Sequence, residues 1–232
     1  MASTEPIRIS AAGLVDGAVR IAPVAIFVVP FGLAFGVAAT QIGLHTGQAT
    51  LMSAVVHAGA SQFAALDFWT HPLTLLPLLL AVFAVNARHL LLGAALYPWM
   101  RPLPAWQRYA SAALISDANW AMAMAAYEKG ERNLGLLVGS GLMMWLAWVG
   151  GTALGAGLGA ALAAPERLGL DALMLTFFAC VLVDMGRRED IARPWSAAAL
   201  AALAAVWLLP PNWHILAGGI AGGLVGAFAN DR

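Results

Sequence analysis

Asn86, Arg88 and His89 bring a carboxamide, a guanidinium and an imidazole into residues 72–97, a stretch that is otherwise apolar. If this stretch is one membrane helix, Arg88 lies roughly 13 Å from its end at Tyr97, near the middle of a ~30 Å hydrocarbon layer. Placing an Arg at that depth costs about 2.5 to 3.5 kcal/mol, so it must face protein or a water-filled cavity and have a partner. The residues indicate either a structural ion pair between two helices or a site for a substrate or ion.

Asp117 and Asn119 form a second polar group, within the apolar segment of residues 106–127. If this segment and the one before it form an antiparallel hairpin, Asp117 lies roughly 16 Å in from the same side as Arg88. Charges inside a membrane find partners, so the sequence predicts an Arg88–Asp117 pair. Such a pair either opens when a substrate or proton arrives or never opens, and both alternatives stay open at this point.

A third group consists of Gly59, Ser61 and Gln62, which lie with His57 near the centre of residues 49–69. This concentration of small and polar residues predicts a broken helix. A half-helix that begins near Gly59 would direct free backbone N–H groups and a positive dipole end into the protein, as in transporter folds that hold a substrate carboxylate. The alternative is that the small residues allow close helix packing, with Gln62 hydrogen bonded across the interface.

Composition defines the class of protein that must position these residues. Hydrophobic residues make up 61% of the 232 residues and charged residues 10%, and the mean hydropathy is +0.79. Soluble domains are roughly 45–50% apolar, so the sequence predicts an all-α polytopic membrane protein. The net charge of zero gives no indication of nucleic-acid binding. The single cysteine, Cys180, excludes an intramolecular disulfide and a metal site made of cysteines.

One integral membrane domain is expected over residues 1–232, and residues 1–22 are expected to form an interfacial N-terminal segment. The first membrane segment, residues 23–44, contains Pro30, which removes a backbone donor and predicts a kink or unwound stretch. The apolar segments after the three described above are residues 134–164, 170–185, 195–209 and 213–229.

The distribution of basic residues supports a count of eight segments with a cytoplasmic N-terminus. Cytoplasmic regions then receive eight basic residues and the outer regions three, as expected from the excess of Lys and Arg in cytoplasmic loops. The eight are Arg8, Arg20, Lys129, Arg132, Arg187, Arg188, Arg193 and Arg232, and the three are Arg101, Arg108 and Arg167. Eight spans place both termini in the cytoplasm. Seven spans are the alternative, because a short sixth segment or a re-entrant second one would change the count.

Together these residues resemble the AzlC-type branched-chain amino acid permeases. The resemblance rests on Pro30-Phe31-Gly32 with Gly36, on the runs from Ala58 to Phe63 and from Asn86 to Leu91, on Ser116-Asp117, on Trp145 with Thr152 and Gly155, and on Leu170-Asp171. It implies the large subunit of a two-component exporter of Leu, Ile, Val and often Met in the cytoplasmic (inner) membrane. It also implies a partner, a separately encoded small membrane subunit with four helices, of the AzlD type.

On this interpretation the chain is a secondary transporter, coupled to an ion or proton, whose site is built from helix breaks and buried polar groups. The predicted transport-pathway residues are Pro30, Gly59, Ser61, Gln62, Asn86, Arg88, His89, Asp117 and Asn119. No GxxxxGK[ST] phosphate loop occurs in the sequence, so ATP binding by this chain is not expected, and neither is a metal or other cofactor.

Two positions depart from the family pattern. Many relatives have an acidic residue directly after the position of Asp117, where this chain has Ala118. The position of His57 is usually apolar or aromatic. A carboxylate pair at the first position is therefore not expected here, and His57 is a local feature of this protein.

Two other classes of function compete with transport. An intramembrane serine protease would use Ser61, in the run Gly59-Ala60-Ser61, together with a histidine. A Ser–His pair is recognised by geometry and not by such a run, so this alternative ranks low. A non-transporting membrane scaffold would gain nothing from the intramembrane charges of Arg88 and Asp117. A transporter without enzymatic activity is therefore the preferred interpretation.

Overall fold

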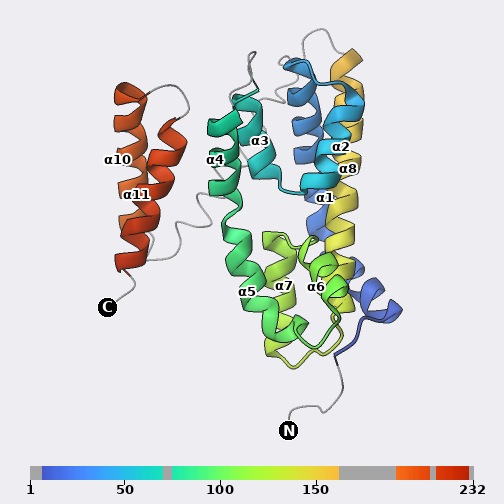
Figure 1. Cartoon of the computed structure of the whole chain (residues 1–232). Helices are drawn as coiled ribbons and strands as arrows, with labels where there is room; N and C mark the ends of the chain where they lie inside the picture. The colour runs from blue at the N-terminus through green and yellow to red at the C-terminus, as the bar shows by residue number, and fades with distance from the viewer. Residues whose placement is uncertain (1–6, 70–74, 162–191, 210–212, 230–232) are drawn as a thin grey trace. The chain divides into compact units, whose positions relative to one another are not determined.

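The structure is a computed structural model that describes residues 7–69, 75–161, 192–209 and 213–229 (Figure 1). These residues are almost entirely α-helical, as the composition predicts. The helices are α1 (Ala11–Gln41), α2 (Thr46–Val56), α3 (Gly59–Asp67), α4 (Leu75–Asn86), α5 (Arg88–Met100), α6 (Ala105–Ala112), α7 (Asp117–Glu128), α8 (Gly135–Ala161), α10 (Ala192–Leu208) and α11 (Trp213–Ala229). The predicted sixth segment, residues 170–185, lies outside the described residues.

Two compact units divide the chain. The first consists of Met1–Gly59 and Asn86–Leu170, and the second of Ala60–Val85 and Asp171–Arg232. Within the described residues, three helical stretches are long and apolar enough to cross a membrane: Ala11–Gln41, Leu75–Met100 and Gly135–Gly159.

α1 is longer than predicted. It begins after Ser10, whose hydroxyl accepts a hydrogen bond from the Gly13 N–H at 3.2 Å. It then continues for 31 residues through Pro23 and Pro30, which corresponds to ~46 Å. The expected interfacial segment is thus continuous with the first membrane segment. No unwound stretch interrupts α1 at Pro30, because the hydrogen bonds of the helix continue on both sides of the missing donor.

Glycines hold α1 and α8 in close contact. A Cβ atom at Gly32 would lie 2.6 Å from the Trp148 carbonyl oxygen, and one at Gly151 would lie 2.5 Å from the Val29 carbonyl oxygen. The same reciprocal arrangement pairs Gly17 with Leu136, Gly139 with Leu14, Gly36 with Thr152, and Gly155 with Leu33. Residue numbers rise together on both helices, so α1 and α8 run parallel. Glycines at four-residue spacing thus let the two helix backbones approach closely, as is common in membrane helix pairs.

We call the end where α1 and α8 begin the near end, and the end where they finish the far end. α2 runs antiparallel to α8 from the far end. The Thr46 hydroxyl donates to the Ala156 carbonyl at 3.3 Å, and the Trp145 indole N–H donates to the Ala54 carbonyl at 2.9 Å. α2 therefore covers only the far half of α8.

The near half of α8 is flanked by α6 and α7, and α5 packs against α7 (Figure 1). α5 and α7 run parallel, because three contacts between them follow the same order in both helices. Arg88 pairs with Asp117, the Trp120 indole N–H donates to the Leu92 carbonyl at 3.1 Å, and the Trp99 ring stacks on Tyr127 with centroids 5.3 Å apart.

This parallel arrangement corrects the predicted fourth segment. α5 ends at the near end, and α6 runs from there to the level of Arg88. The chain turns at residues 113–116, and α7 returns toward the near end as far as the level of Trp99. Residues 106–127 therefore form a re-entrant hairpin and not a crossing. α6 carries Gln107, Arg108 and Ser111, and such a short polar helix cannot span the hydrocarbon layer.

α10 and α11 in the second unit follow the predicted boundaries of the last two segments closely. They pack as an antiparallel pair, since Gly218 faces Ala198 and Ala202 while Gly222 faces Pro194 and Ala198. Gly218, Gly222 and Gly226 thus make helix contacts, whereas nothing lies within 4 Å of a Cβ position at Gly219 or Gly223.

Candidate functional site

Three interruptions of helices lie at one level of the first unit. α2 ends at His57, α4 passes into α5 at Ala87, and α6 and α7 are separated by residues 113–116. The His57 ring lies close to both the backbone of Ala113 and the His89 ring. The sequence predicted one of these interruptions, the break before Gly59.

His57 ends α2 in the left-handed conformation, with φ 45° and ψ 41°. A non-glycine residue pays of order 1–3 kcal/mol for such a backbone, and strained residues of this kind cluster at functional sites. The residue is half-buried, and its Nδ1 atom is fully shielded without a hydrogen-bond partner among the described residues. The imidazole is therefore held inside the protein with hydrogen-bonding capacity to spare.

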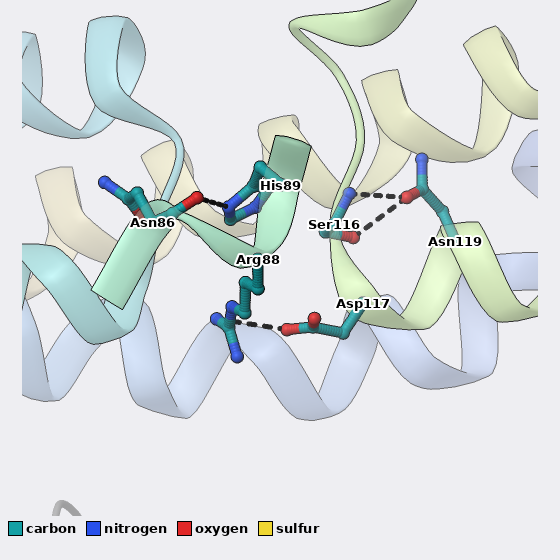
Figure 2. Close-up of polar contacts among 6 residues, drawn as sticks. All are labelled: Asn86, Arg88, His89, Ser116, Asp117 and Asn119. Atoms are coloured by element: carbon teal, nitrogen blue, oxygen red, sulfur yellow. Dashed lines mark hydrogen bonds and ion pairs between the residues drawn. The ribbon is translucent and has the colours of Figure 1, made fainter. Parts of the chain in front are cut away.

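At the second interruption, one backbone hydrogen bond and one side-chain hydrogen bond close the turn. The Leu90 N–H donates to the Ala87 carbonyl at 3.1 Å, three residues back, so the helix tightens locally. His89 Nδ1 donates to the Asn86 carbonyl at 3.3 Å (Figure 2). Ala87 keeps helical dihedral angles, and α4 and α5 follow each other as the 26-residue apolar stretch Leu75–Met100, with Arg88 close to its middle.

Asn119 fixes the third interruption. Its Oδ1 accepts from the Ser116 N–H at 2.6 Å, and its Nδ2 donates to the Leu114 carbonyl at 2.9 Å and the Leu137 carbonyl at 3.5 Å. Asn119 is fully buried, and its bond to the Ser116 N–H is part of a capping box at the start of α7. Its carboxamide is thus engaged in holding the turn that presents Asp117.

Arg88 and Asp117 point toward one another from α5 and α7, each at the first residue of its helix (Figure 2). A guanidinium nitrogen of Arg88 lies 3.1 Å from the Asp117 carboxylate. The predicted pair is confirmed, although it joins parallel helices and not the antiparallel hairpin assumed from the sequence. The side chains are 44% and 59% exposed, so the pair is open on one side.

We call His57, Arg88, His89, Ser116 and Asp117 the polar seam. It lies beside residues 137–148 of α8, as the contacts of Asn119 with Leu137 and of residues 54–59 with Trp145 and Trp148 show. The seam brings together three of the predicted pathway residues, Arg88, His89 and Asp117, from two segments that are separated in the sequence.

Asn86 and Asn119, which are also predicted pathway residues, contribute hydrogen bonds to two of the interruptions, and four predicted residues remain. α3 begins at Gly59, where a Cβ atom would approach the Trp148 ring to 2.7 Å, so both the predicted half-helix and the packing alternative apply there. Ser61 and Gln62 are buried within α3. Pro30 is exposed on α1.

Two residues of this region were not among the predicted pathway residues. His57 appeared only as an unusual residue beside Gly59, although an ionisable group at the end of an apolar helix was a usable signal. Trp148 stacks on Phe35 with centroids 5.9 Å apart and covers Gly59. One tryptophan among nine in an apolar chain gave no signal for that role.

Comparison with known proteins gives the family. The sequence profile described as "AzlC protein" matches residues 23–162, more than half of the chain and all three interruptions. The chain belongs to the AzlC family. It is similar to a relative named "Inner membrane protein YgaZ" from Escherichia coli K12, with 30% identity over 212 residues that cover 86% of this chain and 84% of the relative.

A second similar protein is an "Uncharacterized membrane protein" from Archaeoglobus fulgidus, with 32% identity over 133 residues and 57% of each chain covered. No solved structure matches this AzlC-family chain. Family and relatives indicate a membrane protein with a transporter-type role.

Proposed function

We propose that this chain is the large subunit of a secondary exporter of branched-chain amino acids, Leu, Ile and Val, and of Met. The observation that carries the proposal is the Arg88–Asp117 pair, which is half-exposed near the middle of an apolar helical stretch. Membership of the AzlC family supports the transport class, and the resemblance to its branched-chain permeases supports the substrates and direction.

The exposure of this pair favours a transport pathway over a scaffold. Charged side chains near the bilayer centre face a water-filled cavity or another protein and not lipid, because a charge in hydrocarbon is strongly destabilising. An ion pair that only joined two helices would be best covered on all sides. The open side of Arg88 and Asp117 is therefore the side from which a polar solute or proton reaches them.

The structure gives little support to the serine-protease alternative. Ser61 is 1% exposed and lies inside α3, so its hydroxyl is not open to a peptide substrate. A serine-directed covalent probe tests this directly, and stoichiometric labelling of Ser61 would favour the protease.

Coupling to a proton or ion gradient is part of the proposal, since the sequence has no phosphate loop for ATP. The small four-helix subunit of the AzlD type is the proposed partner. A neighbouring reading frame of ~100 residues with four apolar segments, whose product purifies with this chain, is the expected finding.

The near end is proposed to be cytoplasmic, and the membrane to be the inner membrane. With α6–α7 re-entrant, the described basic residues of the first unit outside the seam all fall in its near half. They are Arg8, Arg20, Arg101, Arg108, Lys129 and Arg132. The far-end residues 41–46 and 156–161 contain no Lys or Arg. The predicted cytoplasmic N-terminus is thus kept, but Arg101 and Arg108 move to the same side as it.

Transport is tested in cells that express the chain with its small subunit and are fed dipeptides containing valine, leucine or methionine. Expression should lower the intracellular pool of at least one of these amino acids relative to cells with the small subunit alone. Unchanged pools for all of them would contradict the proposed function.

A further inference from the structure

We propose that Arg88 and Asp117 form the binding site for the head group of an α-amino acid zwitterion, with the guanidinium binding the substrate carboxylate and the Asp117 carboxylate binding the substrate ammonium. The inference rests on the proposed function, which supplies amino acids as the class of solute. It adds which atoms of the chain bind the part that all amino acids share.

The chemistry of the pair matches that of the head group. Arg presents five N–H donors in a planar fork suited to carboxylates, and a carboxylate accepts from an ammonium. Arg88 and Asp117 approach each other through one nitrogen–oxygen contact of 3.1 Å, so further donors and acceptors of both groups are available on the open side. A carboxylate and an ammonium carried on one carbon fit against two such groups side by side.

Charge balance makes the exchange feasible in an apolar surrounding. Without substrate, Arg88 and Asp117 neutralise each other, and a buried charge left without its partner is strongly destabilising. A zwitterion offers each group a new partner of opposite charge, so no charge is left unpaired before or after binding. A solute with only one of the two charges leaves either Arg88 or Asp117 uncompensated.

The two groups are also positioned by different elements. Asp117 is the first residue of α7, and its position is set by the capping box of Ser116 and Asn119. Arg88 is the first residue of α5, next to the turn that His89 closes on the Asn86 carbonyl. Because the pair joins two helices through side chains alone, it can separate without breaking a backbone hydrogen bond.

The first test uses the unaltered chain, expressed with its small subunit, and displacement of radiolabelled leucine from membranes. The competitors are unlabelled leucine, leucinamide, which keeps only the ammonium, and 4-methylpentanoate, which keeps only the carboxylate. Each analogue should compete at least about tenfold less well than leucine, since charged hydrogen bonds are lost. An analogue that matches leucine within about twofold overturns the inference, because a single charge would then suffice.

The second test matches variants to competitors. In Arg88→Gln, leucine should bind no better than leucinamide, because no guanidinium is left to recognise the carboxylate. In Asp117→Asn, leucine should bind no better than 4-methylpentanoate. A purely structural pair would weaken all ligands alike and keep the wild-type order of affinities, and that order in either variant would overturn the inference.

The Asp16–Arg20 pair on α1 provides the matched control. It is an Asp–Arg pair of similar exposure, with 2.8 Å between Arg20 Nε and Asp16, but it lies outside the polar seam. Asp16→Asn and Arg20→Gln should keep the wild-type order of the three competitors, and loss of that order in these variants would count against a role specific to Arg88 and Asp117. If the unaltered chain neither binds nor exports leucine, valine or methionine, the proposed function itself fails. Leucine binding without preference for the zwitterion refutes only the inference.

Discussion

The α1–α8 pair and the polar seam lie in the same unit and are built on opposite rules. α1 and α8 are uninterrupted, and their contact is so close that six glycines leave no room for a side chain. In the polar seam three chain segments break or tighten, and side chains replace the missing backbone hydrogen bonds. One region is packed through glycines, whereas the other gathers charged and polar side chains.

This difference shows how an apolar chain can hold charges at a defined depth. Backbone groups inside a membrane must be satisfied internally, so breaks are tolerated only where protein or water supplies partners. The long α1–α8 pair provides a continuous surface. α2 reaches this surface from the far end and the α6–α7 turn contacts it in the near half. We expect substitutions between α1 and α8 to affect folding and substitutions in the polar seam to affect transport.

The largest effect is expected for Gly155→Leu. A Cβ atom there collides with the backbone of Leu33, which cannot move without separating α1 from α8, so the yield of folded protein should fall to near zero. Gly157→Leu is the control on the same helix, because nothing lies within 4 Å of its Cβ position. Size-exclusion profiles in detergent measure both variants. Equal yields would show that the close contact is not required.

Gly59→Leu should block transport while leaving membrane insertion intact. Its side chain would collide with the Trp148 ring, 2.7 Å from the Cβ position, and displace the start of α3. Because the obstacle is a side chain, the fold can adjust at a cost of about 1–3 kcal/mol. Efflux assays and membrane yield are compared for Gly59→Leu and Gly47→Leu, whose Cβ position is open. Full transport by Gly59→Leu would contradict the prediction.

A smaller effect is expected for Asn119→Leu, which keeps the size of a fully buried side chain but removes its hydrogen bonds. The Ser116 N–H and the Leu114 carbonyl lose their partners, which should lower the free energy of unfolding by about 1–3 kcal/mol. Ser116→Ala, which removes only a hydroxyl, should cost about 1 kcal/mol. Thermal unfolding of the purified protein distinguishes them, and an Asn119→Leu variant as stable as wild type would show that the turn forms without this cap.

The smallest effect is expected for His57→Gly. Glycine adopts the left-handed conformation of this position without strain, so the variant should gain up to about 1 kcal/mol of stability. His57→Ala removes the same ring but keeps the strained backbone and serves as the comparison. If His57→Gly is no more stable than His57→Ala, the left-handed backbone is not a source of strain. A His57→Ala variant that is much less stable than wild type would show that the ring holds the interruption together, whereas a His57→Gly variant of higher stability with slower transport would place the imidazole in the pathway.

Much of the fold follows from hydrophobic runs and glycine spacing. The boundaries of α8, α10 and α11, the start of α3 at Gly59 and the Arg88–Asp117 pair agree with the expectations from sequence. Each depends on a local pattern, such as the length of an apolar run or a charge that needs a partner. Such patterns survive in a single sequence.

The relative direction of α5 and α7 was not predictable in the same way. The apolar run at residues 106–127 has the length of a crossing, and only the order of its contacts with α5 shows that it turns back. The capping box of Ser116 and Asn119 was present in the sequence as a helix-start signal inside a supposed span. This cap and the polar residues of α6 are the physical reason why residues 106–127 form a hairpin and not the predicted crossing.

The re-entrant α6–α7 hairpin also has a consequence for biosynthesis. A hairpin that enters and leaves at the same end cannot be threaded across the bilayer by the insertion machinery as a span, since α6 is too short and polar. Its turn is held by the Leu137 carbonyl of α8, which is synthesised afterwards. The polar seam therefore forms late, after α8 has packed against α1 and the α6–α7 hairpin can contact α8.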